Sequence, residues 1–393
     1  MITATKTAQI PTATVPRETL VAALAVCDRF APSKGASRIS WNIRLLARPN
    51  DVAIEATSGS RTIRVPLSGA ESGDWFSVLI CGGHLGVVAR ETAGDRIEIA
   101  YYAERRRVEV VAGSSWFALV ADDPTGYPEE DSAVQGPRTE VKAGDLARAF
   151  RSTMFAATLV PSAFAFGGCL IRPLNEGILV AATDGSRFSE ARIGAKFAGD
   201  WPAKSPVVLP LRTAKVVAGL LEGFDPRDPV EIAVDEARVL FGLPGGVEIR
   251  SYQAAGVFPR IDKVFPVTVT NPVAMTAGPL LGLARMASIS AHPQARGVEF
   301  SFGPGVIAVD SISPDGVGAR HGIPIGGGPD STVDVTINPA LLVDFLQVLD
   351  PKASIEVEVR GPREALVIRA EGGHRYALMP MVGAGPRYRE AAR

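Results

Sequence analysis

The feature of this sequence that most constrains its fold is an internal repeat. The stretch Ala182-Thr183-Asp184-Gly185-Ser186-Arg187 is a near copy of Ala56-Thr57-Ser58-Gly59-Ser60-Arg61, and the two copies lie 126 residues apart. Asp-Gly between two strand-like runs, as in the second copy, is a strong signal for a hairpin turn. Repetition at a fixed spacing indicates a chain built from similar structural units.

Three amphipathic helices extend the repeat beyond this turn. In each of them, apolar or small residues recur at i, i+3, i+4 and i+7, which is the pattern of a helix that packs one face on a core. The stripes are Leu20, Ala23, Leu24 and Cys27 in residues 18–30, Leu146, Ala149, Phe150 and Thr153 in residues 144–154, and Leu280, Leu283, Ala284 and Ala287 in residues 278–290. Three similar helices therefore open three segments.

Each segment continues with alternating strands and a second apolar helix. The expected second helices cover residues 82–90, 211–221 and 338–349. The pattern predicts an α+β fold of three repeated domains, each with two helices and about eight strands. We place the domains at residues 1–138, 139–268 and 269–393, with linkers in the Pro-containing stretches 128–140 and 263–272, about 14 disordered residues at the start and an extra tail at 383–393.

Composition limits the possible partners and compartments. Lys and Arg number 41 against 42 Asp and Glu, so a formal charge of −1 gives no general attraction to nucleic acid or to an anionic membrane. Cys27, Cys81 and Cys169 are too few and too scattered for a disulfide framework or zinc cluster, and we interpret them as core residues in a reducing compartment. No secretory signal or long apolar run is present, which predicts a soluble cytosolic protein.

Signals for catalysis are weak. The histidines show no metal-ligand spacing, and no hydrolase, phosphate-binding or zinc-protease motif occurs. Asp184 could act as a general base, but a carboxylate that accepts hydrogen bonds from its own turn is the simpler interpretation. The run Arg105-Arg106-Arg107 is expected at a solvated hairpin tip. We therefore expect no catalytic residue, no metal and no cofactor. The histidines are His84, His292, His321 and His374.

Three motifs on this threefold repeat resemble the bacterial β sliding clamp, the processivity subunit of the replicative DNA polymerase III. They are "ATDGSRF" at 182–188, "FPRIDKVFP" at 258–266 and "YALMPM" at 376–381, and the resemblance spans about Val15 to Val382. It implies a head-to-tail homodimer that forms a closed ring, with helices lining a hole around double-stranded DNA. It also implies a non-catalytic protein whose partners are a replicative polymerase subunit, the clamp loader and other clamp-motif proteins.

The resemblance further implies a partner-peptide groove between the second and third domains. There, Met379 and Met381 would adapt to apolar side chains, while Arg187 and Asn338 would satisfy peptide carbonyls. The positions that match the family's groove are Phe166, Thr183, Gly185, Ser186, Arg187, Phe188, Pro259, Lys263, Val264, Asn338, Leu341, Leu378, Met379, Pro380 and Met381.

Cations on the expected helices are candidates for loose contact with DNA phosphates. The alternative for each is a solvated helix face. The candidates are Arg148, Arg151, Arg212, Lys215 and Arg285. By the family's arrangement, an edge of the first domain, around residues 95–110, would join an edge of the third domain in a second copy.

Three features depart from the family pattern. Ser186 stands where the family often has histidine, Lys263 stands where arginine is common, and the chain continues through a basic tail, Val382 to Arg393. These departures leave a second hypothesis open, a specialised clamp paralogue that is duplicated, phage-encoded or inhibitor-resistant and has altered partner choice. An enzyme on the same fold is a minor third alternative.

Overall fold

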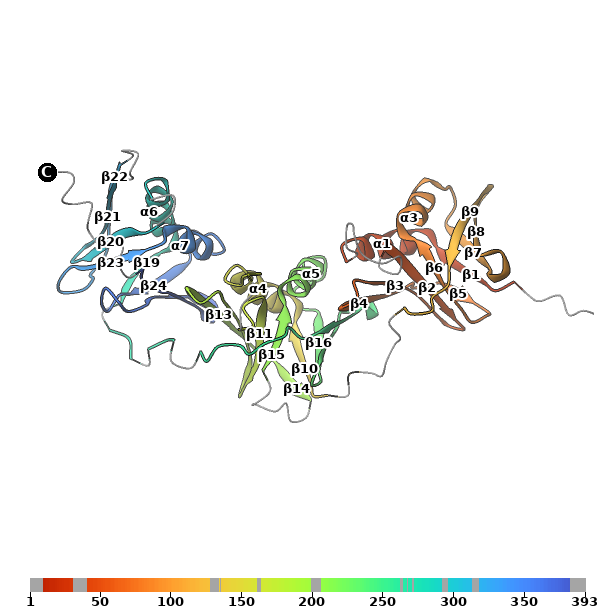
Figure 1. Cartoon of the computed structure of the whole chain (residues 1–393), viewed down its shortest axis with the longest axis horizontal. Helices are drawn as coiled ribbons and strands as arrows, with labels where there is room; N and C mark the ends of the chain where they lie inside the picture. Colours follow the sequence, from red (N-terminus) through yellow and green to blue (C-terminus); the bar gives the residue numbers. More distant parts are fainter. Residues whose placement is uncertain are drawn as a thin grey trace, which may run out of the picture. The chain divides into compact units, whose positions relative to one another are not determined.

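The computed structural model describes residues 10–30, 41–127, 134, 136–160, 164–198, 206–261, 264–266, 268–270, 272–291, 296–312 and 318–381. Contacts divide the chain into two compact units, and Figure 1 labels most of their elements. The first unit comprises residues 1–143, 197–200 and 219–253, and the second comprises residues 144–196, 201–218 and 254–393.

The first unit is built on one sheet of 14 strands. Helices α1 (Arg17–Asp28) and α3 (Gly82–Glu91) pack against each other. In spatial order, the strands are β14 (Lys196–Ala198), β10 (Arg138–Lys142), β16 (Pro229–Val234), β17 (Arg238–Gly242), β18 (Glu248–Tyr252), β4 (Arg61–Pro66), β3 (Asp51–Thr57), β2 (Asn42–Arg48), β6 (Phe76–Cys81), β9 (Ser115–Asp122), β8 (Arg107–Ala112), β7 (Arg96–Tyr102), β1 (Thr12–Pro16) and β5 (Glu71–Ser72).

The start of the chain differs from expectation. We expected disorder to about residue 14, but β1 pairs with β7 along its whole length, and Ala13 and Val15 are 0% exposed. Alternate small and branched side chains fill one sheet face, so this segment gains enough burial to be ordered. Residues 1–9 lie outside the described residues.

The second unit contains two sheets. The larger has the order β15 (Val207–Pro210), β11 (Gly168–Leu174), β12 (Gly177–Thr183), β13 (Arg187–Ile193), β26 (His374–Leu378), β25 (Leu366–Ala370), β24 (Ser354–Glu358) and β19 (Val273–Thr276). The smaller has the order β22 (Gly318–Pro324), β21 (Val306–Ile312), β20 (Val298–Gly303) and β23 (Val333–Ile337). The helices are α4 (Ala143–Met154), α5 (Leu211–Leu221), α6 (Ala277–Ile289) and α7 (Pro339–Leu346).

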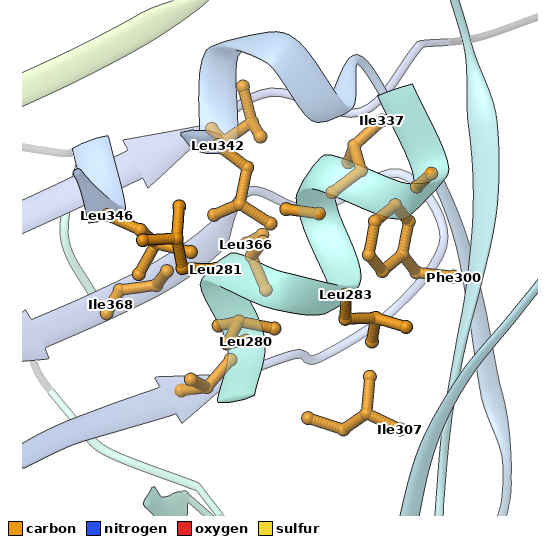
Figure 2. Packing of buried hydrophobic residues seen from close by; sticks show 14 of the residues in the cluster. Leu280, Leu281, Leu283, Phe300, Ile307, Ile337, Leu342, Leu346, Leu366 and Ile368 are labelled. Carbon is orange, nitrogen blue, oxygen red and sulfur yellow. The ribbon is translucent and has the colours of Figure 1, made fainter. Parts of the chain in front are cut away.

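The core of the third segment shows why the helical stripes fold as they do. Leu280 and Leu283 of α6 are at most 1% exposed and pack among strand residues such as Phe300 and Ile307 (Figure 2). Leu342 of α7 joins the same cluster. Burying each such side chain contributes about 2 kcal/mol. The stripes predicted in α1 and α4 are likewise buried, so all three predictions are confirmed.

In both units, a strand from the following segment completes a sheet. In the first unit, β18 from the second segment pairs antiparallel with β4 from the first. In the second unit, β26 from the third segment pairs antiparallel with β13 from the second. The repeat in sequence is therefore also a repeat in strand pairing.

The α+β class is confirmed. In the described part of the chain, the three expected segments hold two helices each and nine, nine and eight strands, with β10 counted in the second segment. Cys27 and Cys169 are buried as expected, whereas Cys81 is only half-buried at the end of β6. All three thiols are free.

Candidate functional site

The turn Thr183–Arg187 is a hairpin turn between β12 and β13. Asp184 Oδ1 accepts hydrogen bonds from the backbone N–H groups of Ser186 (2.9 Å) and Arg187 (3.1 Å). Gly185 has φ +92°, a conformation that favours glycine. Thr183 Oγ1 donates to Arg187 O (2.6 Å) and accepts from Gly185 N. Asp184 therefore shapes its own turn, as expected, and is committed to that role.

The C-terminal motif lies directly beside this turn. The backbone N–H of Met379 donates to Ser186 O (2.9 Å), and that of Met381 donates to Thr336 O (2.8 Å). Met379 is 47% exposed, while Pro380 and Met381 are half-buried. The structure thus brings together two motifs separated by about 190 residues and presents flexible apolar side chains at their junction.

Arg187 has a different role from the one expected. Its Nη1 donates to Asp344 Oδ2 (2.6 Å), its Nη2 donates to Phe155 O (2.6 Å) and its Nε donates to Asp184 Oδ2 (3.0 Å). The guanidinium carbon lies 5.4 Å from the centre of the Phe155 ring. A side chain only 9% exposed and bound this way holds the turn to α4 and α7. It is poorly placed to donate to peptide carbonyls.

The electrostatics of Arg187 agree with a structural role. Burial alone would lower the pKa of its guanidinium, but the hydrogen bond to Asp344 and the nearby Asp184 carboxylate outweigh burial, so the pKa is raised. The side chain therefore stays charged at any physiological pH.

Two expected wall residues belong to the core instead. Phe188 is 4% exposed and Leu378 is 0% exposed, so neither side chain is available to a ligand. Phe188 pairs with Ala377 and Leu378 pairs with Arg187, so the two side chains lie on opposite faces of the sheet and belong to two different core clusters.

We expected a linker to begin at residue 263, but residues 264–266 are anchored in the core. Phe265 is buried, and its ring centre lies 5.5 Å from that of Phe188. The Arg375 guanidinium stacks 4.3 Å from the Phe265 ring and pairs with the buried carboxylate of Glu190. Val264 packs on the same cluster. Pro259 is half-buried, and Lys263 lies outside the described residues.

Helix α7 places the remaining groove residues. Asn338 caps the helix, because its side-chain oxygen accepts from Ala340 N, so only its amide NH₂ is oriented to serve a ligand as a donor group. The Leu341 carbonyl accepts from the buried Tyr376 hydroxyl (2.8 Å). Asn338 and Leu341 are both half-buried.

An exposed apolar strip adjoins the turn. Phe166 was predicted there from sequence, whereas Phe164 and Val257 were missed. The Phe164 and Phe166 ring centres lie 5.5 Å apart, and the Phe166 ring lies against Gly185. Phe164 is 50% exposed and bridges to Val257, which is 74% exposed. The available signal was the pair of aromatic residues at positions 164 and 166, because alternate residues of an extended segment point to the same face.

All the expected DNA-facing cations are exposed. Arg148 pairs with Asp145 on its own helix (2.7 Å). The exposed side chains lie on α4, α5 and α6, and they are Arg148, Arg151, Arg212, Lys215 and Arg285.

The first unit contains a close copy of the turn. Thr57 Oγ1 donates to Arg61 O (3.0 Å) and accepts from Gly59 N (3.1 Å), as Thr183 does with Arg187 and Gly185. Tyr252 N donates to Ser60 O (3.0 Å), the counterpart of the bond from Met379 to Ser186. The sequence repeat therefore encodes the same turn, closed by the same following strand.

Other kinds of site find no support in the described part of the chain. Its His, Cys, Asp and Glu residues form no group of three or more that could hold a metal ion. None of its helices is long and apolar enough to cross a membrane.

Solved bacterial structures share this architecture. A DNA polymerase III subunit beta from Pseudomonas aeruginosa superposes with a TM-score of 0.86 at 17% identity, covering 94% of this chain and 99% of that one. A DNA polymerase sliding clamp from Bacillus subtilis gives 0.84 at 18%, covering 95% and 99%. The beta sliding clamp of C. crescentus gives 0.82 at 21%, covering 94% and 99%. Neither a protein-family model nor a curated protein matches the sequence.

These likenesses define the class of fold. Nearly the whole chain has the architecture of a bacterial DNA sliding clamp. At 16–21% identity, the likeness establishes the fold.

Proposed function

We propose that this protein is a non-catalytic DNA sliding clamp that encircles double-stranded DNA and confers processivity on a replicative polymerase. The observation that carries the proposal is the junction of the 183–187 turn with the 379–381 segment, on a chain with the clamp fold. Met379 is exposed at this junction, and exposed Phe164 packs on Phe166, whose ring lies against Gly185 of the turn. Apolar side chains of a partner peptide would pack on this surface.

The peptide groove comprises the turn, the anchored segment around Pro259 and Val264, the start of α7 and the C-terminal motif. All of its described residues lie in the second unit, so one compact body presents the whole site. The proposed occupants are short motifs of the replicative polymerase subunit, the clamp loader and other clamp-motif proteins. Lys263 is proposed as a further contact.

The near-neutral charge suits a protein that holds DNA topologically. Exposed cations on α4, α5 and α6 would touch phosphates loosely, and few phosphate contacts give weak, salt-sensitive affinity. Such a clamp would slide in the cytoplasm along nucleoid DNA.

We further propose domain boundaries near residues 138 and 268.

The homodimer needs a pair of complementary edges. In the described residues, β7 and β8 are paired on both sides, so the segment 95–110 that we expected offers no free edge. β9 pairs with β6 only at Ala121 and Asp122, which leaves the edge of Ser115–Val120 open. Its natural partner is β22, an edge strand of the smaller sheet, in a second copy.

Encirclement has a direct test. The protein is added to linear duplex DNA with biotinylated ends, streptavidin is added afterwards, and the mixture is passed through a gel-filtration column in moderate salt. We expect retention on capped DNA and release from uncapped DNA. Equal behaviour with and without caps contradicts encirclement.

The dimer edge is tested by Val120→Lys, since Val120 is 78% exposed at the open edge of β9. We expect monomers by analytical ultracentrifugation, because a desolvated lysine opposes pairing of this edge. The matched change Val111→Lys, on the internal strand β8, should leave the dimer intact.

The specialised-paralogue hypothesis rests on Ser186, Lys263 and the tail from Val382 to Arg393. A peptide titration distinguishes it from the general clamp. A labelled peptide with a glutamine and paired hydrophobic residues should bind a general clamp at tens of micromolar or tighter. No binding by an assembled dimer favours altered partner choice.

A further inference from the structure

A hollow of about 630 Å³ lies near the C-terminal end of α4, the start of α5 and the segment after α7. None of the groove residues named above lines it. Its walls are Arg151, Met154, Phe155, Ala157, Leu211, Lys215 and Val348, all in the second unit.

The lining combines two kinds of chemistry. Five of the seven residues are apolar, and Arg151 and Lys215 are exposed cations. Arg148 and Arg212 add two exposed cations on the same two helices. An apolar hollow with a cationic rim complements a ligand that is both anionic and apolar.

The apolar wall is held in place before any ligand arrives. The Phe155 ring lies 6.0 Å from the Tyr376 ring and 6.4 Å from the Phe345 ring, and the Arg187 guanidinium covers it at 5.4 Å. Val348 remains 38% exposed. A fixed aromatic wall lowers the entropy lost when a flat group packs against it.

We propose that this hollow binds an unpaired nucleotide of DNA, a proposal that rests on the clamp function above. The phosphate would lie between Arg151 and Lys215, and the base would enter the hollow against Phe155. Single-stranded DNA sites combine cations that follow the backbone with aromatic side chains that pack on bases. A paired base is stacked within the duplex, so the hollow favours the end of a primer or a single-stranded gap.

The charges favour DNA over an acidic apolar peptide. Arg151 and Lys215 line the hollow from two helices, and Arg212 is a further exposed cation on α5, so successive phosphates of one strand can each meet a positive charge, whereas an acidic side chain would use only one of these cations. An acidic peptide is therefore the competing occupant for the test.

The first variant fills the hollow without changing charge. Val348→Trp should weaken binding of a fluorescein-labelled oligothymidylate about tenfold, measured by anisotropy at low salt, because the base loses its place. Binding of a duplex of the same length should not change. Val306→Trp is the matched control, since Val306 on β21 is 39% exposed and lies outside the hollow. Ala157→Leu narrows the hollow by a smaller change if Val348→Trp fails to fold.

The second variant removes charge and keeps the hollow. The double change Arg151→Gln with Lys215→Gln should lower the salt dependence of oligothymidylate binding by about 1.4 in log K per log salt, as two lost phosphate contacts on a single strand require. Lys352→Gln, on an exposed loop, should leave that slope unchanged.

The outcomes separate this proposal from the clamp function. If the filled variants bind oligothymidylate as the wild type does, or if the wild type binds none, the nucleotide proposal is overturned. If they lose affinity only for an acidic apolar peptide, it is also overturned. Retention of the wild type on capped duplex DNA then shows whether the clamp function stands without it.

Discussion

His374 makes the second unit sensitive to acid. Its Nε2 lies 3.0 Å from Ser189 Oγ, whose hydroxyl donates to Ser152 O (2.7 Å). The imidazole packs edge-on against the Phe345 ring at 5.0 Å. The Ser189 hydroxyl donates its only proton to Ser152 O, so it can only accept a hydrogen bond from His374. Nε2 of His374 therefore carries the proton of the neutral imidazole. A second proton would charge a ring that is 5% exposed.

Burial of this ring lowers the pKa of His374 from 6.5 to about 4, although a backbone hydrogen bond to Ser152 opposes the shift. Between these values, the unfolded chain binds a proton that the folded chain does not. Stability is therefore complete above about pH 6.5 and falls as the pH drops toward 4. The lowered pKa corresponds to a loss of about 3 kcal/mol in the free energy of unfolding by about pH 4.

The assay is urea unfolding followed by circular dichroism at several pH values between 7 and 4. We expect His374→Gln to lose less free energy of unfolding over this range than the wild type, by about 3 kcal/mol. His84→Gln, which changes an exposed histidine in the first unit, should retain the wild-type pH dependence. Parallel pH profiles for the wild type and His374→Gln would refute the reasoning.

Three further outcomes follow from the candidate groove. Met381→Ala should weaken partner peptides several-fold and leave the dimer intact by ultracentrifugation, whereas loss of the dimer would mean that this segment is structural. Arg187→Met should lower the free energy of unfolding by about 2 kcal/mol, because the Phe155 carbonyl, Asp184 Oδ2 and Asp344 Oδ2 each lose the hydrogen bond from the guanidinium. Gly185→Ala and Gly59→Ala should each cost about 1 kcal/mol at positive φ, while only the first should weaken peptide binding. Equal peptide affinities for the two alanine variants would contradict the site.

Sequence reasoning succeeded where the information is local. The stripe that begins at Leu20 and the turn at Thr183 depend on neighbours within a few residues, so periodicity and turn chemistry predicted them correctly. It failed for contacts across long separations. Asp344 binds Arg187 from 157 residues away, and no local pattern indicates that this arginine is already occupied. The open edge of β9 was also beyond reach, because it depends on the order of strands in the sheet.

Pairing of β18 with β4, and of β26 with β13, has a consequence for how this chain can be divided. A fragment that stops near residue 138 keeps β4 but loses the strand that covers its edge, and a fragment that stops near residue 268 leaves β13 bare in the same way. Unpaired edges of this kind promote aggregation. During synthesis, each of the first two repeats thus completes its sheet only when a strand of the following repeat has been made. Excised single repeats should therefore be less soluble than fragments that extend through β18 or β26.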